Sequence, residues 1–292
     1  MKIAVIGAGR IGLAVAKLLR KGGHTVRIWD KDASRMRPRM AIAEAVSGAQ
    51  FVFLCVPSWG LREVLRGMRS HSSARQIFIA FTKGIEKNTG MFPYDVLRAE
   101  FPKNDCAVIG GPFLAEELNR ALYGVGVVGT PKRSVFLKIE KIFRGTPAKF
   151  VHSSDARGVS VAGVLKNIYA VGLGIADGLM WGENAKGWLS AELGEEMVRA
   201  GVFLGAKRET MARAGMADFL ASGWSPYSRN RGTGEAILRH RMKSTASEGI
   251  ASYPSARVLL APKARLFPYF SHLAAVVGGR ENARLVFEKF LR

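Results

Sequence analysis

The stretch "KIAVIGAGRIG" at residues 2–12 runs from a β-branched apolar segment directly into a glycine-rich turn. Gly7, Gly9 and Gly12 have the spacing of the dinucleotide-binding fingerprint. In that motif the first glycine makes a tight turn, the second lets the backbone approach a pyrophosphate, and the third allows close packing of the helix on the strand. Asp30 directly follows the next apolar run, at the position where such folds carry an acid. The sequence therefore predicts a strand, a phosphate-binding turn and a helix.

Further short apolar runs follow at regular intervals through the first half of the chain, with helical patterns between most of them. The predicted strands lie at 24–29, 51–56, 76–81, 106–110, 123–129 and 148–152. Alternating strands and helices indicate a parallel sheet covered on both faces. After residue 152 the strand pattern stops and apolar-rich helices take over. We therefore predict a Rossmann-type α/β domain with a mostly parallel sheet over residues 1–152, and an all-helical substrate-binding and catalytic domain over 153–292.

The composition is that of a globular protein, with 48% hydrophobic residues in 292. We find no apolar run long enough to span a bilayer and no signal peptide, so we expect a cytoplasmic protein without a membrane span. Cys55 and Cys106 lie in predicted strands and are expected to be buried free thiols, and no Cys/His spacing indicates a metal.

The net charge is +21, and the basic excess is spread over both halves of the chain. Runs such as "RMRPRM" (35–40) and "RHRMK" (239–243) are compatible with nucleic-acid binding. Aromatic residues are not interleaved with these runs, however, as stacking platforms would be. We expect a solvated basic surface that attracts small anions, and no specific nucleic acid as a partner.

Two loops follow predicted strands at the edge where ligands bind in open α/β sheets. Lys83, in "FTKGIE", comes just after the strand at 76–81. The segment "GGPFLAEEL" (110–118) follows the next strand, and its turn can direct backbone N–H groups at an anion before a helix that we expect to begin at Phe113. Either segment taken alone would also fit an ordinary surface loop.

The helical half contains one lysine in an unusual setting. Lys166 and Asn167 lie in the middle of "GVLKNIYAVGLGIADG" (163–178), which is apolar on nearly every face and therefore predicts a buried helix. A buried ammonium needs a partner or a function, unless Lys166 lies at a rim and extends its charged end into water.

A polar stretch further along predicts a phosphate clamp. Arg229 and Arg231 flank Asn230, with Ser228 just before them, and an arginine fork with amide and hydroxyl donors suits a phosphate. Asp218 precedes the clamp and could orient the head of Lys166. A charged, solvated loop is the alternative.

Taken together, these motifs resemble the bacterial-type NAD(P)-dependent glycerol-3-phosphate dehydrogenases over essentially the whole chain. The motifs that carry the resemblance occur in the order of that family: "GAGRIG" (7–12), "CVPS" (55–58), "TKGIE" (82–86), "GGPFLAEE" (110–117), "LKNIYAVGLGIADG" (165–178), "GENAK" (182–186), "GMAD" (215–218), "SRNR" (228–231) and Glu248-Gly249.

The resemblance implies reduction of dihydroxyacetone phosphate to sn-glycerol 3-phosphate, with Lys166 as the proton-transfer residue. The implied substrate contacts are Lys83, Gly111, Lys166, Asp218, Ser228, Arg229 and Asn230. The implied cofactor contacts are Gly7, Gly9, Arg10, Ile11, Gly12, Asp30, Lys31, Lys83, Ala115, Arg229 and Glu248. Two alternatives stay open, a non-catalytic dinucleotide-binding sensor or scaffold and a reductase for a related phosphorylated ketone. A homodimer is also open.

The chain departs from the family at several positions. The segment 30–50 is shorter than usual and lacks a further strand, and Phe113 replaces a small hydroxyl residue of the substrate site. Ser160 replaces an acid, and Ser222 replaces a threonine. Whether Phe113 narrows the substrate pocket is not decided by the sequence.

Cofactor preference depends on Asp30. A carboxylate at this position hydrogen-bonds the ribose 2′-hydroxyl of NAD and repels the 2′-phosphate of NADP. Four basic residues follow at once and could embrace that phosphate if the carboxylate turned away: Lys31, Arg35, Arg37 and Arg39. Because the carboxylate acts at contact distance, we expect NAD(H) to be preferred, with NADP(H) as the alternative.

Overall fold

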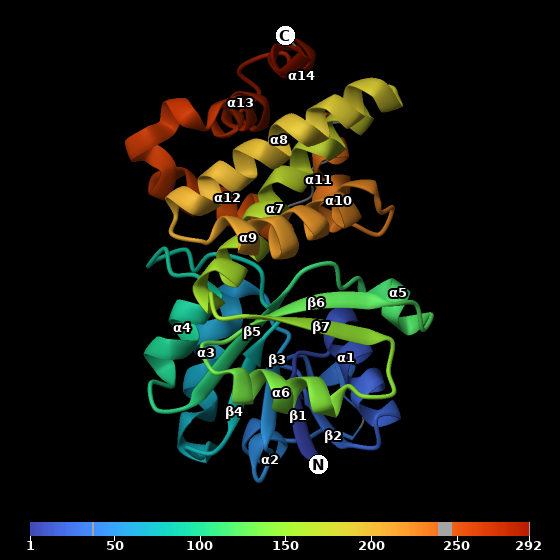
Figure 1. The fold of residues 1–292 in the computed structure, drawn as a ribbon, viewed down its shortest axis with the longest axis vertical. Coiled ribbons are helices and arrows are strands. Elements are labelled where there is room, and N and C mark those ends of the chain that lie inside the picture. Colours follow the sequence, from blue (N-terminus) through green and yellow to red (C-terminus); the bar gives the residue numbers. More distant parts are fainter. Residues whose placement is uncertain (37, 239–246, 292) are drawn as a thin grey trace. The chain divides into compact units, whose positions relative to one another are not determined.

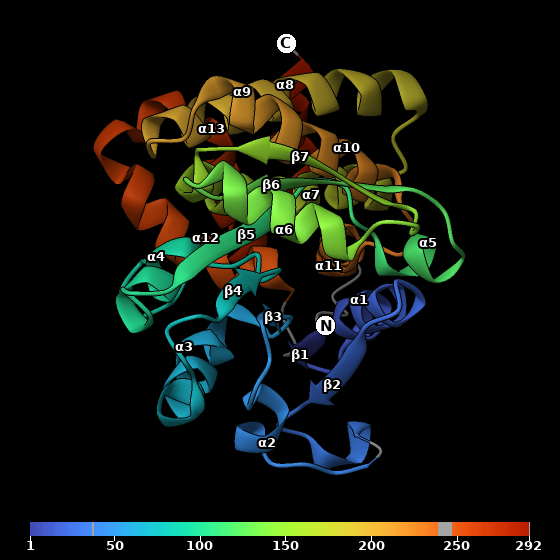
Figure 2. The ribbon, with the colours of Figure 1, turned by 60° about the horizontal axis from the view of Figure 1, so that its bottom comes forward.

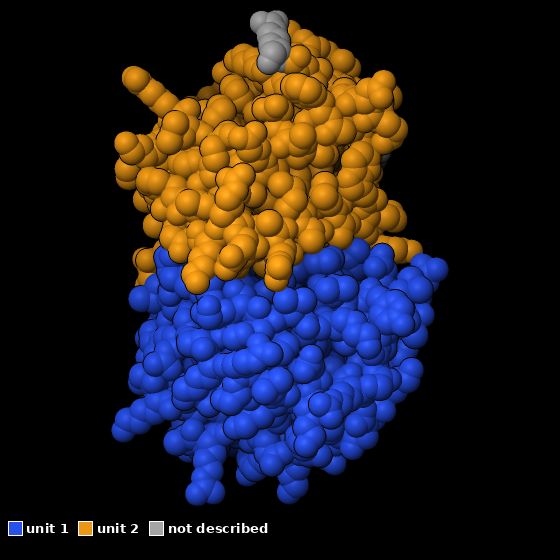
Figure 3. Space-filling view, in the orientation of Figure 1, with its two compact units in different colours: residues 1–83, 91–160 blue, residues 84–90, 161–292 orange. Residues whose placement is uncertain are grey.

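The structure, a computed structural model, describes residues 1–36, 38–238 and 247–291. The chain forms two compact units, shown in blue and orange in Figure 3. Unit 1 comprises residues 1–83 and 91–160, and unit 2 comprises residues 84–90 and 161–292. The basic segment "RHRMK" (239–243) lies outside the described residues.

Unit 1 is built on a seven-stranded sheet with the strand order β2-β1-β3-β4-β5-β6-β7 (Figure 1). All neighbouring strands are parallel except β5 and β6, which pair antiparallel. The strands are β1 (Lys2–Ile6), β2 (Thr25–Trp29), β3 (Phe51–Leu54), β4 (Ile77–Ala80), β5 (Asp105–Gly110), β6 (Gly124–Gly129) and β7 (Ala148–Ser153). The prediction of a mostly parallel Rossmann-type sheet is confirmed.

Six helices connect these strands: α1 (Arg10–Lys21), α2 (Ile42–Val46), α3 (Ser58–Met68), α4 (Pro93–Glu100), α5 (Ala115–Asn119) and α6 (Arg133–Ile142). The short α5 lies against α1 (Figure 2), where Lys17 Nζ donates to the carbonyl of Asn119 at 2.9 Å. Between β2 and β3 the described residues form a 3-10 turn (Ala33–Arg35) and α2, and they contain no further strand.

The core of unit 1 contains a row of aromatic rings that includes Phe113. This ring is 5% exposed and lies 5.5 Å from the ring of Phe81 and 5.6 Å from that of Phe150, centroid to centroid. Gly124 leaves room for it, since a Cβ there would lie 3.0 Å from the ring. Phe113 is therefore a core residue of this unit. The helix expected to begin at Phe113 begins two residues later, at Ala115, because the backbone of Leu114 is still extended and the ring of Phe113 is packed in the core.

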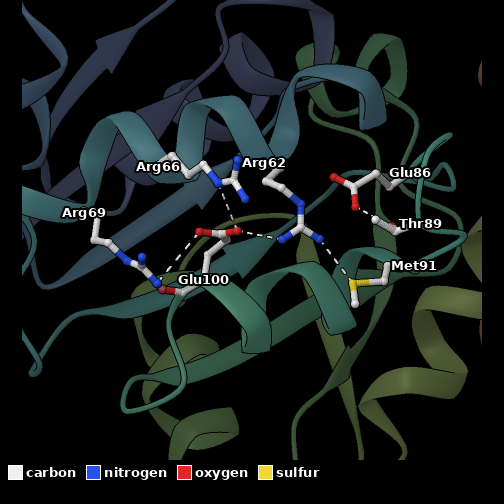
Figure 4. A network of polar contacts seen from close by, with 7 residues as sticks. All are labelled: Arg62, Arg66, Arg69, Glu86, Thr89, Met91 and Glu100. Carbon is white, nitrogen blue, oxygen red and sulfur yellow. Dashed lines mark hydrogen bonds and ion pairs between the residues drawn. The ribbon is translucent and has the colours of Figure 1, made fainter.

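A buried carboxylate ties α3 to α4 on the surface of unit 1 (Figure 4). Glu100 is 5% exposed and accepts from Arg62 at 2.6 Å and from Arg66 at 3.3 Å, and Arg69 lies 3.8 Å from its second oxygen. Arg62 and Arg66 are four residues apart on α3, so they lie on the same face of that helix.

Unit 2 is helical in its described part, as predicted. Its helices are α7 (Ala156–Gly178), whose first turn belongs to unit 1, α8 (Glu183–Phe203), α9 (Arg208–Thr210), α10 (Ala217–Trp224), α11 (Arg229–Leu238), α12 (Glu248–Leu260), α13 (Pro268–Val277) and α14 (Ala283–Phe287). A π-helical stretch, Met211–Met216, joins α9 to α10. Helix α7 is long and apolar enough to cross a membrane, but its apolar window is entirely buried in the protein, as expected of a core helix.

Candidate active site

The fingerprint turn has the backbone geometry that a dinucleotide requires. Gly7 has a φ of +105°, which strongly favours glycine, and a Cβ there would lie 2.5 Å from the carbonyl oxygen of Cys55. A Cβ on Gly12 would collide with the carbonyl of Gly7, so α1 packs directly against the turn. A Cβ on Gly9 would meet no atom within 4 Å, which leaves open space beside the backbone. The turn therefore fits a pyrophosphate at the start of α1.

The side chains at the start of α1 are held within unit 1. Arg10 forms an ion pair with Glu116 of α5, and Ile11 packs against the hydrophobic core. The first turn of α1 carries no acidic residue, so its backbone N–H groups present a positive end to an anion. The backbone N–H groups of Arg10 and Ile11 can thus face a cofactor phosphate, while their side chains hold α1 in place within unit 1.

Asp30 braces the fingerprint turn from the end of β2. Its Oδ2 accepts from the N–H of Ala8 at 2.6 Å, and its Oδ1 accepts from the N–H of Asp32 at 2.9 Å. Because each oxygen accepts from a backbone N–H group, the carboxylate is kept from turning away. Each oxygen retains a second lone pair, so the group can still accept from a ribose hydroxyl.

The basic residues after Asp30 are partly engaged with acids of their own. Lys31 Nζ lies 2.7 Å from Glu63, and Arg35 Nε lies 3.1 Å from Asp32, all with exposed side chains. Arg39 is exposed, and Arg37 lies outside the described residues.

The structure brings together Lys83 and Gly111, two of the predicted substrate residues. Lys83 Nζ donates to the carbonyl of Gly111 at 3.2 Å. Gly111 has a φ of +86°, and a Cβ there would lie 2.9 Å from the carbonyl of Val125, so this turn requires glycine. Ala115, a predicted cofactor residue, is the first residue of α5. The ammonium of Lys83 therefore contacts the turn at Gly111, which leads into α5 four residues later.

In unit 2, Lys166 is buried and has partners of complementary chemistry. Its side chain is 8% exposed, and Nζ lies 3.0 Å from Asp218 Oδ1 and 2.8 Å from Ser222 Oγ, to which it donates. Asp218 is 1% exposed, so the two charges compensate each other in an apolar surrounding. Lys166 therefore does not extend into water from a rim, and its charged end is held by α10.

Two asparagines connect α7, α11 and α12 beside this pair. Asn230 Nδ2 donates to Asn167 Oδ1 at 2.7 Å, and Asn230 Oδ1 accepts from the N–H of Gly249 at 3.0 Å. Both asparagines are buried. Glu248, a predicted cofactor residue, is the first residue of α12 and is half-buried.

The predicted phosphate clamp lies at the start of α11. Ser228 Oγ accepts from the N–H of Arg231 at 3.3 Å and so caps this helix, while Arg229 is its exposed first residue. Ser228 keeps its hydroxyl hydrogen for a ligand. Of the two arginines of the expected fork, Arg231 is paired with Asp177 of α7 and so anchors the helix.

Asp177 also accepts from Lys186 Nζ at 2.8 Å, and Lys186 lies over the ring of Trp224 at 4.8 Å. Together with the pairing of Arg231 and Asp177, these contacts fix α7, α8, α10 and α11 to one another. The "GENAK" and "IADG" motifs thereby meet in space.

Comparisons with known proteins identify the family of the chain. The family model described as the NAD-dependent glycerol-3-phosphate dehydrogenase C-terminus matches residues 155–288, and the model of the N-terminus of that family matches residues 2–40 and 34–135. The chain belongs to the NAD-dependent glycerol-3-phosphate dehydrogenase family.

Relatives in this family cover most of the chain. Glycerol-3-phosphate dehydrogenase [NAD(P)+] of Clostridium acetobutylicum is 32% identical over 260 residues, which are 81% of this chain and 78% of the relative. The enzyme of the same name from Clostridium tetani is 30% identical over 80% of this chain and 74% of its own length. The crystal structure of glycerol-3-phosphate dehydrogenase from Coxiella burnetii matches with a TM-score of 0.90 at 25% identity, covering 99% of this chain and 98% of that one.

Several residues that contact the predicted site residues were not themselves among them. Asn167, Ser222 and Asp177 each contact a predicted residue directly. The available signal was that Asn167 and Asp177 lie in the same motif as Lys166 and that Ser222 follows Asp218 by four residues. Only the fold shows which hydroxyl or carboxylate reaches which partner. Ser222 keeps the hydroxyl of the usual threonine. Ser160, which replaces an acid, accepts from the first-turn N–H of Tyr94 in α4 at 3.0 Å.

Proposed function

We propose that this chain reduces dihydroxyacetone phosphate to sn-glycerol 3-phosphate with NAD(P)H, and so supplies the glycerol backbone of phospholipids. The observation that carries the proposal is the buried lysine of α7, Lys166, held between Asp218 at 3.0 Å and Ser222 at 2.8 Å. An ammonium in such a site is positioned and charged, as proton transfer to an oxygen requires.

The reduction needs one hydride and one proton. The reduced nicotinamide, when bound, supplies the hydride that the carbonyl carbon accepts. Lys166 gives its Nζ proton to the oxygen as the carbonyl double bond opens, which leaves a neutral alcohol and a neutral amine. Asp218 stabilises the ammonium before transfer and favours its recovery from solvent afterwards, since an adjacent carboxylate favours the charged form of a lysine.

The remaining family residues hold the two ligands. Arg229, Ser228 and Asn230 offer guanidinium, hydroxyl and amide donors for the substrate phosphate, Lys83 adds a second charged group, and Gly111 offers its backbone. The fingerprint loop, Ala115, Glu248 and Arg229 would hold the cofactor, with Asp30 at the ribose. Positioning of this kind lowers the barrier by several kcal/mol, at an order-of-magnitude estimate.

Two points of the proposal concern the setting of the reaction. We infer a cytoplasmic enzyme, because both cysteines are buried free thiols. Burial raises the pKa of the Cys106 thiol to about 11 and raises that of the Cys55 thiol further, so both thiols stay protonated. A homodimer, a related phosphorylated ketone as the substrate, and a sensor without turnover are alternatives that purified protein distinguishes.

The direct test follows NADH absorbance with dihydroxyacetone phosphate and a panel of small phosphorylated ketones. Lys166→Ala is expected to lower kcat by at least ~100-fold, since it removes the proton donor. The matched control is Lys138→Ala, which removes an exposed lysine of α6 and should leave kcat unchanged. Near-full activity of Lys166→Ala would exclude the proposed role, and cofactor binding without turnover on any ketone would favour the sensor.

A further inference from the structure

Behind the turn of α7 that carries Lys166 lies a buried carboxylate for which the reaction has no direct use. Glu196 of α8 is 2% exposed and reaches both α7 and α13. Its Oε1 accepts from the hydroxyl of Tyr169 at 3.0 Å, and both of its oxygens lie 3.2 Å from the backbone N–H of Tyr269. Tyr169 follows Lys166 by three residues, so the two side chains leave α7 one turn apart on neighbouring positions.

The second tyrosine holds the same turn of α7 through its backbone. The hydroxyl of Tyr269 donates to the carbonyl of Ile168 at 2.9 Å, and its ring stacks on that of Tyr169 at 4.7 Å. Gly172 makes room for this ring, because a Cβ there would lie 2.9 Å from it. Tyr269 is the second residue of α13, so Glu196 also places a negative charge at the N-terminus of that helix.

We propose that Glu196 is a positioning residue for Lys166: its carboxylate, with Tyr169 and Tyr269, clamps the catalytic turn of α7 between α8 and α13. This inference rests on the proposed function, because it assigns the clamp to the turn that carries the proton donor. The clamp requires a charged carboxylate, since a carboxylate offers acceptors at both oxygens, whereas a protonated carboxyl would turn an O–H toward donors.

The charge on Glu196 is sensitive to pH. Burial raises the pKa of this carboxyl to about 7, although the bonds from Tyr269 and Tyr169 and the charge of Arg199 act in the opposite direction. The groups that face it are Tyr169 from α7, Tyr269 from α13 and Arg199 on α8 itself, and Tyr253 of α12 acts on Tyr269. Burial also raises the pKa of Tyr169 and Tyr269 well above the usual value, so both remain donors.

The test compares Glu196→Gln with Glu195→Gln. Glutamine copies the protonated carboxyl, whereas Glu195 is exposed, pairs with Arg199 at 2.8 Å and serves as the matched control. Wild-type kcat should fall about five-fold as the pH drops from 8 to 6, and Glu196→Gln should show the lower kcat at both pH values. The KM for NADH should stay unchanged, and Glu195→Gln should behave as wild type.

A second readout needs no substrate. Hydrogen exchange of the backbone amides at 168–172 should be about ten-fold faster in Glu196→Gln than in wild type at pH 8, and Tyr169→Phe should show the same direction. If wild type does not turn over dihydroxyacetone phosphate, the proposed function fails while exchange still tests the clamp. If wild type is active and Glu196→Gln matches it in kcat, pH profile and exchange, the clamp is wrong.

Discussion

At the scale of single residues, Asp30 decides how the cofactor is discriminated. Its carboxylate is fixed by the N–H groups of Ala8 and Asp32, so it cannot rotate away from an approaching 2′-phosphate. Two unit charges about 4 Å apart at an effective dielectric near 20 repel each other by roughly 4 kcal/mol before screening. Lys31 and Arg35, which would oppose this effect, are paired with Glu63 and Asp32.

We therefore expect kcat/KM for NADH to exceed that for NADPH by about ten-fold, or about 1.4 kcal/mol. Asp30→Asn should bring the ratio close to one, because the amide keeps an acceptor for Ala8 but loses the charge, and Asp30→Gly loses both. Steady-state kinetics with both cofactors at matched salt measures this. A wild-type preference for NADPH would mean that the basic residues dominate.

At the scale of elements, the contact between α7 and α11 depends on two glycines. A Cβ on Gly174 would collide with the carbonyl of Arg231, and a Cβ on Gly234 would collide with that of Val171. The two helix backbones therefore touch, and this contact sets the distance between Asn167 and Asn230.

Gly234→Ala should force the helices apart and cost about 1–3 kcal/mol of unfolding free energy, as overpacking does. It should also raise the KM for the phosphorylated substrate, since Arg229 and Asn230 move with α11. Gly232→Ala is the control on the same helix: a Cβ there meets no atom within 4 Å, and alanine should stabilise the helix by up to about 1 kcal/mol. Urea unfolding of both variants decides the matter, and equal stabilities would contradict a tight crossing.

At the scale of the whole molecule, the burial of Glu196 makes folding depend on pH. The pKa of this carboxyl is about 7 in the folded chain and near 4.5 in the unfolded one, so between these values the native state holds a proton that the unfolded state releases. Its contribution to stability is complete below pH 4.5 and is lost as the pH rises through 7. The loss is on the order of 3 kcal/mol.

Glu196→Gln should remove this dependence, so its free energy of unfolding should change less than that of wild type between pH 4.5 and pH 8. Urea unfolding of wild type, Glu196→Gln and Glu195→Gln at the two pH values measures the difference. An identical pH dependence in wild type and Glu196→Gln would show that Glu196 does not titrate in this range.

The sequence predicted the fold well because its decisive signals are local. Glycine spacing after β1 and the alternation of strands and helices follow from short-range backbone geometry. The antiparallel pairing of β6 with β5, the commitment of Arg231 to Asp177 and the burial of Phe113 depend on which distant segments meet. Glu196 shows the limit most clearly, because a glutamate within "AELGEEMV" looks like any exposed helical acid until the fold places it between two tyrosines.

The three arginines on α3 and the 3-10 turn after it, which contact Glu100 of α4, have a consequence for how this surface can evolve. Three cations share the single buried carboxylate of Glu100, and two of them, Arg66 and Arg69, are largely exposed. The three arginines can replace one another, but the glutamate has no substitute. Either exposed arginine can be substituted while the other two still neutralise Glu100. A change at Glu100 instead leaves all three cations facing one another at once. Neutral drift should therefore be frequent on the arginine side and rare at the glutamate.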